Sequence, residues 1–453
     1  MLQNTDSTKS VTAGVPAAGN AGAPPATAPA GKSALSEGLA LSISGAVGSL
    51  AGFASWLIAA RMMPQEAVGY GSAFVSAFLL VAGTAQLNLD SAMMLWMPRS
   101  GRRAPTLFWR SHAVIVPACA AVGLAYVALE PTLARTGAGN GPIALGVGLF
   151  VIAGIGWGLW GMHDFSLVAI GKGWWAAWRN VVFAVVRIVL LLALGASLGA
   201  QGIVLSWVIP IAVWTLGSAV LVGAFTSRFA RKADTGWMPT RKEAVTFLGP
   251  TTVAHWGTVL LLNQVTVIVV QRFGPVPGAA FFIAWQGVMV IDITAQRFMQ
   301  SLSSQIARDP ERRKEYIAAS RRRLLVIFLP MVVVGIVLAD WGLGIFGPGY
   351  AEAATVLRVL LIGMIPRLLI AHELGKRQAL HDGMGFARLQ LVSTLLVIAV
   401  VLFVPIDDPD ASGGYAVASL LPVAIGYAVV QALCAAGVVI TPLLRRAVGL
   451  RQS

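Results

Sequence analysis

The stretch FAVVRIVLLLALG, residues 183–195, is an apolar run that contains a single charge, Arg187. Its neighbours extend the run to residues 176–197, and about 20 such residues are enough to cross a lipid bilayer. A charged side chain at the centre of such a segment costs about 2.5–3.5 kcal/mol on insertion scales. Arg187 lies near the middle of the run, so the sequence predicts a polar partner or a water-filled cavity for it.

The whole chain has the composition of a protein that crosses the membrane many times. Of its 453 residues, 57% are apolar and 11% are charged, and the mean hydropathy is +0.76. A soluble protein carries about 25% charged residues. The net charge of +14 is interpreted as Lys and Arg retained on the cytoplasmic side, not as a nucleic-acid surface. Two cysteines and five unclustered histidines predict neither a disulfide framework nor a metal site.

Twelve apolar stretches are long enough to span the bilayer. They cover residues 38–60, 69–92, 111–130, 142–162, 176–197, 202–224, 245–270, 277–297, 323–345, 351–372, 386–405 and 414–441.

The loops between these stretches alternate in charge, which predicts their orientation. Of the 33 Lys and Arg residues, 27 fall on one side, 3 on the other and 3 inside spans. Cytoplasmic loops hold the excess of positive charge, so both termini are expected in the cytoplasm and the chain in the cell membrane. The acidic DDPD at 407–410 then lies outside, where a solvated turn is favoured over a glycosyltransferase-type metal site.

The predicted fold class is an all-α polytopic membrane protein with two six-helix bundles. The segments are a disordered cytoplasmic tail (1–37), an N-terminal bundle (38–224), a cytoplasmic linker (225–244), a C-terminal bundle (245–441) and a cytoplasmic tail (442–453). GKS at 31–33 does not make a nucleotide-binding loop, since Ala26 stands where the motif needs glycine. No cofactor is expected.

Six spans per half give both halves the same orientation, which predicts parallel repeats related by a pseudo-twofold axis along the membrane normal. An offset of 211 residues aligns Arg61 with Arg272 and Pro64 with Pro275 without a gap. Substrate sites in such folds lie near the midplane between the repeats. Proline and glycine inside several spans fit helices that bend during transport, or simply close packing.

Charged residues at membrane depth are the candidate site. Arginine binds anions such as phosphate through a planar, permanently charged fork. The predicted substrate-binding residues in the cavity are Arg187, Arg367 and Arg358. The residues predicted for ion coupling or ion pairing are Asp292, Asp90 and Glu373. The alternative for each is a structural pair, such as Arg187 with Asp292. His255, Asn263 and Gln264 are interpreted as hydrogen-bonding contacts between helices.

The basic loop at 303–325 is predicted to be an amphipathic segment. Anchoring to anionic lipid headgroups is the simpler role, worth about 1 kcal/mol per basic residue. Guiding a phosphorylated lipid headgroup toward the cavity is the alternative.

Two regions carry a resemblance to a known family. LIAARMMPQEAVGYGSAFVSAFLLVAGTAQLNLDSAMMLWMPRSG (57–101) and VVFAVVRIVLLLALGASLGAQGIVLSWVI (181–209) resemble polysaccharide and lipid-linked oligosaccharide flippases. That family belongs to the multidrug/oligosaccharidyl-lipid/polysaccharide exporter superfamily. One departure is Asp90, which stands where family members often continue with a Leu-Gly pair.

The resemblance implies a V-shaped pair of bundles that flips an isoprenoid pyrophosphate-linked oligosaccharide by alternating access. The chain is therefore expected to be a transporter and not an enzyme, working with a lipid-linked glycan, membrane lipids and glycan polymerases or glycosyltransferases, and without nucleic acid. An ion-coupled exporter of small molecules or drugs on the same fold is the alternative. A scaffold within a polysaccharide assembly complex is a further one.

Overall fold

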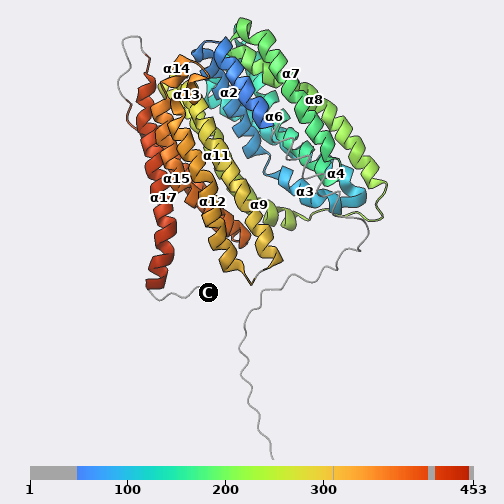
Figure 1. Cartoon of the computed structure of the whole chain (residues 1–453). Coiled ribbons are helices and arrows are strands. Elements are labelled where there is room, and N and C mark those ends of the chain that lie inside the picture. Colours follow the sequence, from blue (N-terminus) through green and yellow to red (C-terminus); the bar gives the residue numbers. More distant parts are fainter. Residues whose placement is uncertain (1–47, 310, 407–413, 448–453) are drawn as a thin grey trace, which may run out of the picture.

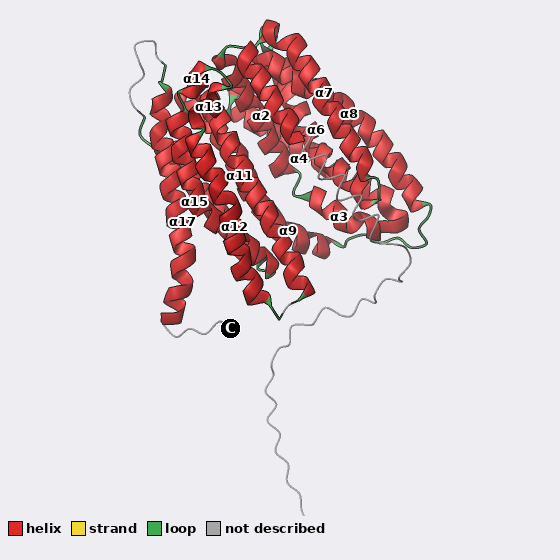
Figure 2. Ribbon diagram, viewed as in Figure 1, coloured by secondary structure: helices red, strands yellow, loops and turns green. Residues whose placement is uncertain are grey.

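The structure, a computed structural model, describes residues 48–309, 311–406 and 414–447. The predicted tail 1–37 and the DDPD turn lie outside the described residues. Within them the chain is helical apart from short connections, and no strand occurs (Figure 2). The all-α fold class predicted from hydropathy is confirmed.

Two bundles follow one another along the chain. The N-terminal bundle contains a helix over residues 48–62, α2 (Gln65–Ala85), α3 (Leu89–Ser100), η1 (Gly101–Arg103), α4 (Ala104–Leu129), α5 (Pro131–Ala138), α6 (Ile143–Ala169), α7 (Gly173–Leu198) and α8 (Ala200–Ala230). The C-terminal bundle contains α9 (Arg241–Val259), the π-helical turn η2 (Leu260–Gln264), α10 (Val265–Phe273), α11 (Pro275–Arg308), α12 (Arg313–Val337), α13 (Ala339–Gly344), α14 (Pro348–Ala351), α15 (Ala354–Ala379), α16 (Gly383–Phe403), η3 (Val417–Leu420) and α17 (Leu421–Ala447).

Ten continuous segments of the described residues are long and apolar enough to cross a membrane. Two further segments complete the predicted twelve. They are the helix at 48–62, at the start of the described residues, and α12, whose first half carries the basic residues of the 308–323 loop. Large apolar side chains are exposed along α8 and α12, including Leu216, Val220 and Val337. Exposed apolar faces of this length fit contact with lipid.

The two bundles lie side by side and meet at one end of the molecule (Figure 1). The basic connections gather at the other end, which we call the basic end; it carries the α3–α4, α8–α9, α11–α12 and α15–α16 junctions. The opposite end carries the short connections between α2 and the helix before it, between α10 and α11, and around α13 and α14. This separation of charge is the one that the loop pattern predicts.

The repeat predicted at an offset of 211 residues places α2 and α11 in equivalent positions, and these helices pack against each other. The Gln65 side chain donates a hydrogen bond to the carbonyl of Val276, its own counterpart, at 3.0 Å. A contact between equivalent residues is what a twofold axis between α2 and α11 predicts.

One helix departs from the predicted spans. The sequence predicts an uninterrupted second span at 69–92, but α2 ends at Ala85 and α3 begins at Leu89. Between them Leu87 and Asn88 have φ angles of +54° and +56°. Right-handed helix cannot continue through that conformation. The equivalent residues of α11 remain helical, so the two repeats differ here.

Prolines inside the helices do not produce the breaks. Pro117, Pro210, Pro330 and Pro366 all lie within continuous helices. Proline is tolerated in membrane helices because neighbouring groups satisfy the freed backbone.

Candidate functional site

Arg187 is held inside the N-terminal bundle. Its side chain is 4% exposed and extends from α7 to the helix at 48–62. Nη2 donates to the carbonyl of Ala51 at 2.9 Å and to Oγ of Ser55 at 2.7 Å. Its guanidinium carbon lies 4.2 Å from the centroid of the Trp207 ring, a favourable cation–π distance. No carboxylate of the described residues lies within salt-bridge distance of it.

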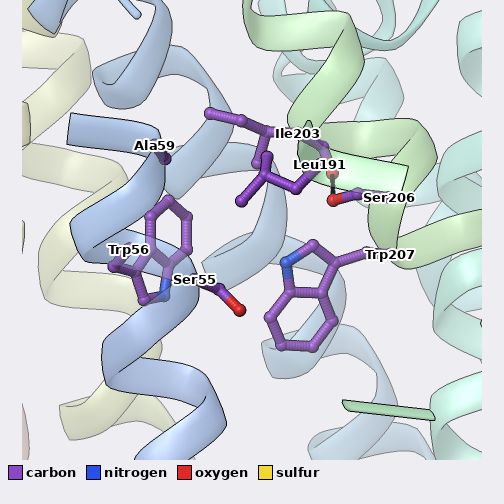
Figure 3. Close-up of a pocket in the computed structure, with 7 residues that line it drawn as sticks. All are labelled: Ser55, Trp56, Ala59, Leu191, Ile203, Ser206 and Trp207. Carbon is purple, nitrogen blue, oxygen red and sulfur yellow. Dashed lines mark hydrogen bonds between the residues drawn. The ribbon is translucent and has the colours of Figure 1, made fainter. Parts of the chain in front are cut away.

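A small cavity lies beside this arginine. Figure 3 shows the side chains of Ser55 and Trp207 facing one another across it. Its volume is about 10 Å³, room for one water molecule at most. Its lining comes from the helix at 48–62, α7 and α8 and consists of Ser55, Trp56, Ala59, Leu191, Ile203, Ser206 and Trp207. Arg187 therefore joins three helices of one bundle at a dry, aromatic position.

Asp292 pairs with Arg367 and not with Arg187. Arg367 Nε lies 2.9 Å from Asp292 Oδ1, and its Nη2 lies 3.0 Å from Oδ2, so the pair is bidentate. The two residues are 0% and 2% exposed. Gln296 donates to Asp292 Oδ2 at 2.8 Å, and Gln390 accepts from Arg367 at 3.4 Å. The C-terminal bundle thus contains a neutral ion pair that connects α11, α15 and α16.

The other predicted site residues are near helix ends. Arg358 pairs with Asp340 at the end opposite the basic end, and both are partly exposed. Glu373, in the last two turns of α15, accepts from Arg377 at 3.0 Å and also from Lys376. Asp90 lies in the first turn of α3, where Oδ1 accepts from the backbone N–H of Ser91 at 2.6 Å. The structure does not bring the six predicted residues into one site.

A second buried ion pair was not predicted from the sequence. Arg179 of α7 lies 2.6 Å from Asp164 of α6, and its guanidinium lies over the ring of Trp160. Asn180 donates to the same carboxylate at 2.9 Å. Arg179 lies near the start of the predicted span 176–197 and is not among the predicted site residues; α7 begins at Gly173, and Arg179 is buried inside the bundle. Because Arg179 lies close to the boundary of the predicted span, the sequence did not indicate that its side chain is buried.

One group of contacts between the two bundles lies at the end opposite the basic end. Arg61 Nε donates to the Ile345 carbonyl at 2.7 Å, and the rings of Trp56 and Phe282 lie 4.5 Å apart. Gly69 fits against the backbone of Pro275 so closely that a Cβ at this position would lie 1.9 Å from the Pro275 oxygen. These contacts join the bundles firmly at this end.

Toward the basic end, α11 exposes a mostly polar face. Gln286, Val290, Thr294, Arg297 and Ser301 are exposed and recur every three or four residues, so they share one side of the helix. In Figure 1, α11 runs along the edge of the C-terminal bundle that faces the N-terminal bundle. Polar groups exposed on a membrane helix normally face water and not lipid. The exposed side of α11 therefore carries water-compatible groups at Gln286, Thr294, Arg297 and Ser301.

Arg297 is the positively charged residue on this face of α11. Its side chain is exposed, and it has no carboxylate within salt-bridge distance among the described residues. The sequence contained a signal for it, because Gln286, Thr294, Arg297 and Ser301 follow a helical period. It is the last residue of the predicted span 277–297 and is not among the predicted site residues.

The chain is similar in fold to solved transporters of the MOP superfamily. The chain superposes on an inward-facing multidrug resistance MATE family transporter of the MOP superfamily with a TM-score of 0.64, covering 92% of this chain and 100% of the other at 15% identity. The outward-facing conformation of such a transporter gives a TM-score of 0.59 at 15% identity, over 93% and 97% of the two chains.

A third similar structure is a MOP superfamily transporter from Pyrococcus furiosus. It matches with a TM-score of 0.54 and 15% identity, over 93% of this chain and 97% of the other. Its report states that the reversed polarity of its binding pocket suggests a different function. No protein-family model and no curated protein sequence matches the chain. The chain has the fold of MATE family transporters of the MOP superfamily.

Proposed function

We propose that the chain exports a cargo across the cell membrane by alternating access of a central space between its two bundles. The polar face of α11 is the observation that carries this proposal. It gives α11 water-compatible groups at membrane depth. The contacts of Arg61, Gln65 and Gly69 close the end opposite the basic end.

The direction of opening depends on orientation. The positive-inside rule assigns the basic end to the cytoplasm. The arrangement described above is then open toward the cytoplasm and closed toward the outside. The TM-score with the inward-facing transporter, 0.64 against 0.59 for the outward-facing conformation, supports the same assignment.

The first cargo class is a small molecule, moved against an ion gradient. This assignment rests on the likeness in fold to multidrug resistance transporters. Neither buried ion pair is free to bind a charged cargo, because each arginine already faces its own carboxylate.

The second cargo class is an isoprenoid pyrophosphate-linked oligosaccharide, as the resemblance in sequence implies. Arg297 favours this cargo, since an exposed guanidinium on the cavity wall can bind a pyrophosphate in two hydrogen bonds. A cationic drug would instead favour a carboxylate at this position.

The phenotype of a deletion strain distinguishes the two cargo classes. If the cargo is a small molecule, cells lacking the chain become more sensitive to toxic compounds, and their lipid-linked glycan pool is unchanged. If the cargo is a lipid-linked oligosaccharide, that lipid accumulates on the inner leaflet and sensitivity is unchanged. Arg297→Gln tests the cavity wall, with Arg135→Gln at the opposite end as its matched control. A strain with neither phenotype, together with a purified protein that moves no cargo in liposomes, contradicts the proposal.

A further inference from the structure

A cavity lies between the two bundles at the end opposite the basic end. Its volume is about 320 Å³, within the range of about 300–1,000 Å³ that is typical of small-molecule sites. One wall comes from α2 and α5 of the N-terminal bundle, and the other from α10 and the start of α11 in the C-terminal bundle. Thr132 and Gln271 on its lining are exposed, so the cavity opens to the surface.

Glu130 brings a negative charge to the lining of this cavity. It lies between α4 and α5 and is half-buried. The hydroxyl of Thr132 and the side-chain amide of Gln271 each donate to one of its two carboxylate oxygens. Each oxygen accepts up to two hydrogen bonds, so both have room for a further donor. No Lys or Arg of the described residues lies within salt-bridge distance of this carboxylate.

Apolar side chains from both bundles make up much of the remaining lining. They are Ala73, Leu133, Val267 and Val270, and Tyr70 adds an aromatic ring. Apolar walls with a few polar groups are typical of sites for organic molecules, and an aromatic ring attracts a positive charge over its face. A metal ion would need several ligands in place of one carboxylate. The lining therefore suits an organic cation with an apolar part.

The two walls of the cavity belong to different bundles and are connected across the junction. Gln271 of the C-terminal bundle donates to Glu130 of the N-terminal bundle. One helical turn before Glu130, the hydroxyl of Tyr126 donates to Oε1 of Gln264 at 2.7 Å. Opening of this end would move the walls apart. A ligand that contacts both walls therefore binds the closed arrangement and stabilises it.

We propose that this cavity binds a small organic ammonium ion from outside the cell, and that the bound ion holds this end closed. The ammonium group donates to Glu130, and the apolar part packs against α5 and α10. The binding is independent of the proposed function, whereas its effect on transport rests on the proposed alternating access. The site is separate from the exposed face of α11, because Arg297 follows Pro275 at a distance of about 33 Å along the helix.

Binding of a pair of probes to the purified full-length chain tests the chemistry of the site. Naphthylmethylammonium joins a positive charge to an apolar ring system, and naphthylmethanol is its neutral counterpart. We expect the ammonium ion to bind at least roughly tenfold more tightly, the gain typical of a hydrogen bond between charged groups. Equal affinities for the two probes would overturn the assignment of an ammonium site.

Two carboxylate variants locate the binding. Glu130→Gln removes the charge and keeps the shape of the side chain, so the affinity for the ammonium ion should fall to that for the alcohol. Glu66→Gln is the matched control, since Glu66 is an exposed carboxylate at the same end that does not line the cavity. It should keep the wild-type affinity. Wild-type affinity in Glu130→Gln would overturn the site.

The effect on closure is measured with spin labels at the basic end, far from the cavity. Arg99→Cys on α3 and Arg388→Cys on α16 are exposed positions, and the background carries Cys434→Ala. Saturating naphthylmethylammonium should raise the fraction of molecules with an open basic end, but not in Glu130→Gln. Gly69→Ala, which disturbs the closed contact with the Pro275 backbone, should weaken ammonium binding by reciprocity.

The outcomes keep this inference apart from the proposed function. Binding through Glu130 that leaves the label distance unchanged, in a chain whose cargo does change that distance, overturns the hold on this end. A chain that moves no cargo in liposomes and shows one label distance under all conditions contradicts alternating access. The binding measurements still decide the ammonium site in that case.

Discussion

At the scale of single residues, burial alone did not reveal what each arginine does. Arg187, Arg367 and Arg179 are all nearly inaccessible, yet two of them face a carboxylate and Arg187 faces a carbonyl, a hydroxyl and an indole ring. Buried charges require compensation. The sequence shows that a partner must exist, but the partner is chosen by helix packing.

Replacing Arg187 with alanine should stop transport and loosen the N-terminal bundle. The substitution leaves the Ala51 carbonyl and Ser55 without their charged donor, and hydrogen bonds to charged groups contribute about 1.5–3 kcal/mol each. Complementation of a deletion strain and thermal unfolding in detergent measure the two effects. Ser55→Ala, which removes one acceptor and keeps the charge, should be milder. Full transport by Arg187→Ala would contradict its predicted role in substrate binding.

The Arg367–Asp292 pair should behave as a unit. Asp292→Asn leaves a buried guanidinium without its counter-charge, and breaking such a pair costs about 3–5 kcal/mol. The double variant Asp292→Asn with Arg367→Met should recover part of the lost stability, because it removes both charges. Thermal unfolding of the single and double variants gives the coupling. Strictly additive losses would show that the residues do not act as a pair.

At the scale of helices, the break between α2 and α3 is the feature that departs most from prediction. A mean hydropathy window passes over residues 86–88 because the apolar residues before them outweigh Gln86 and Asn88 in the average. The backbone instead turns with two positive φ angles, and α9 supplies the hydrogen bonds that the broken helix lacks.

Asn88 should tolerate glycine and reject valine. Glycine reaches a φ of +56° freely, whereas a β-branched residue there is strained by about 1–2 kcal/mol. Asn88→Val should therefore lower the unfolding temperature and weaken the contact between α9 and the N-terminal bundle. Asn88→Gly is the matched control and should unfold near the wild-type temperature. Equal unfolding temperatures for both variants would contradict the strained conformation.

At the scale of the whole molecule, the bundles are joined at one end through close backbone packing, and α9 adds hydrogen bonds to the break between α2 and α3. Gly69 fits against the Pro275 backbone, and Arg61 and Gln65 add hydrogen bonds across the same junction. Alternating access requires this junction to open, so its stability sets the balance between the two arrangements.

Gly69→Ala should shift that balance toward opening of the end opposite the basic end. The added Cβ would lie 1.9 Å from a backbone oxygen, and overpacking of this kind costs about 1–3 kcal/mol. Spin labels at Arg135→Cys and Glu352→Cys, both exposed, should report a longer separation. Gly287→Ala on α11, where a Cβ meets nothing within 4 Å, is the control and should leave the distance unchanged. An unchanged distance in Gly69→Ala would show that this contact does not hold the end closed.

The sequence alone determined the membrane class, the helical fold, the division of basic loops and the two-bundle arrangement. Hydropathy and charge act locally along the chain, because lipid requires every spanning segment to be helical and apolar. Only the tertiary structure decided that Asp292 pairs with Arg367, that Arg297 is exposed on α11, and that side chains of α9 donate hydrogen bonds to the backbone at the break between α2 and α3. These features depend on which helix faces which, and that choice is made by packing between residues far apart in the chain.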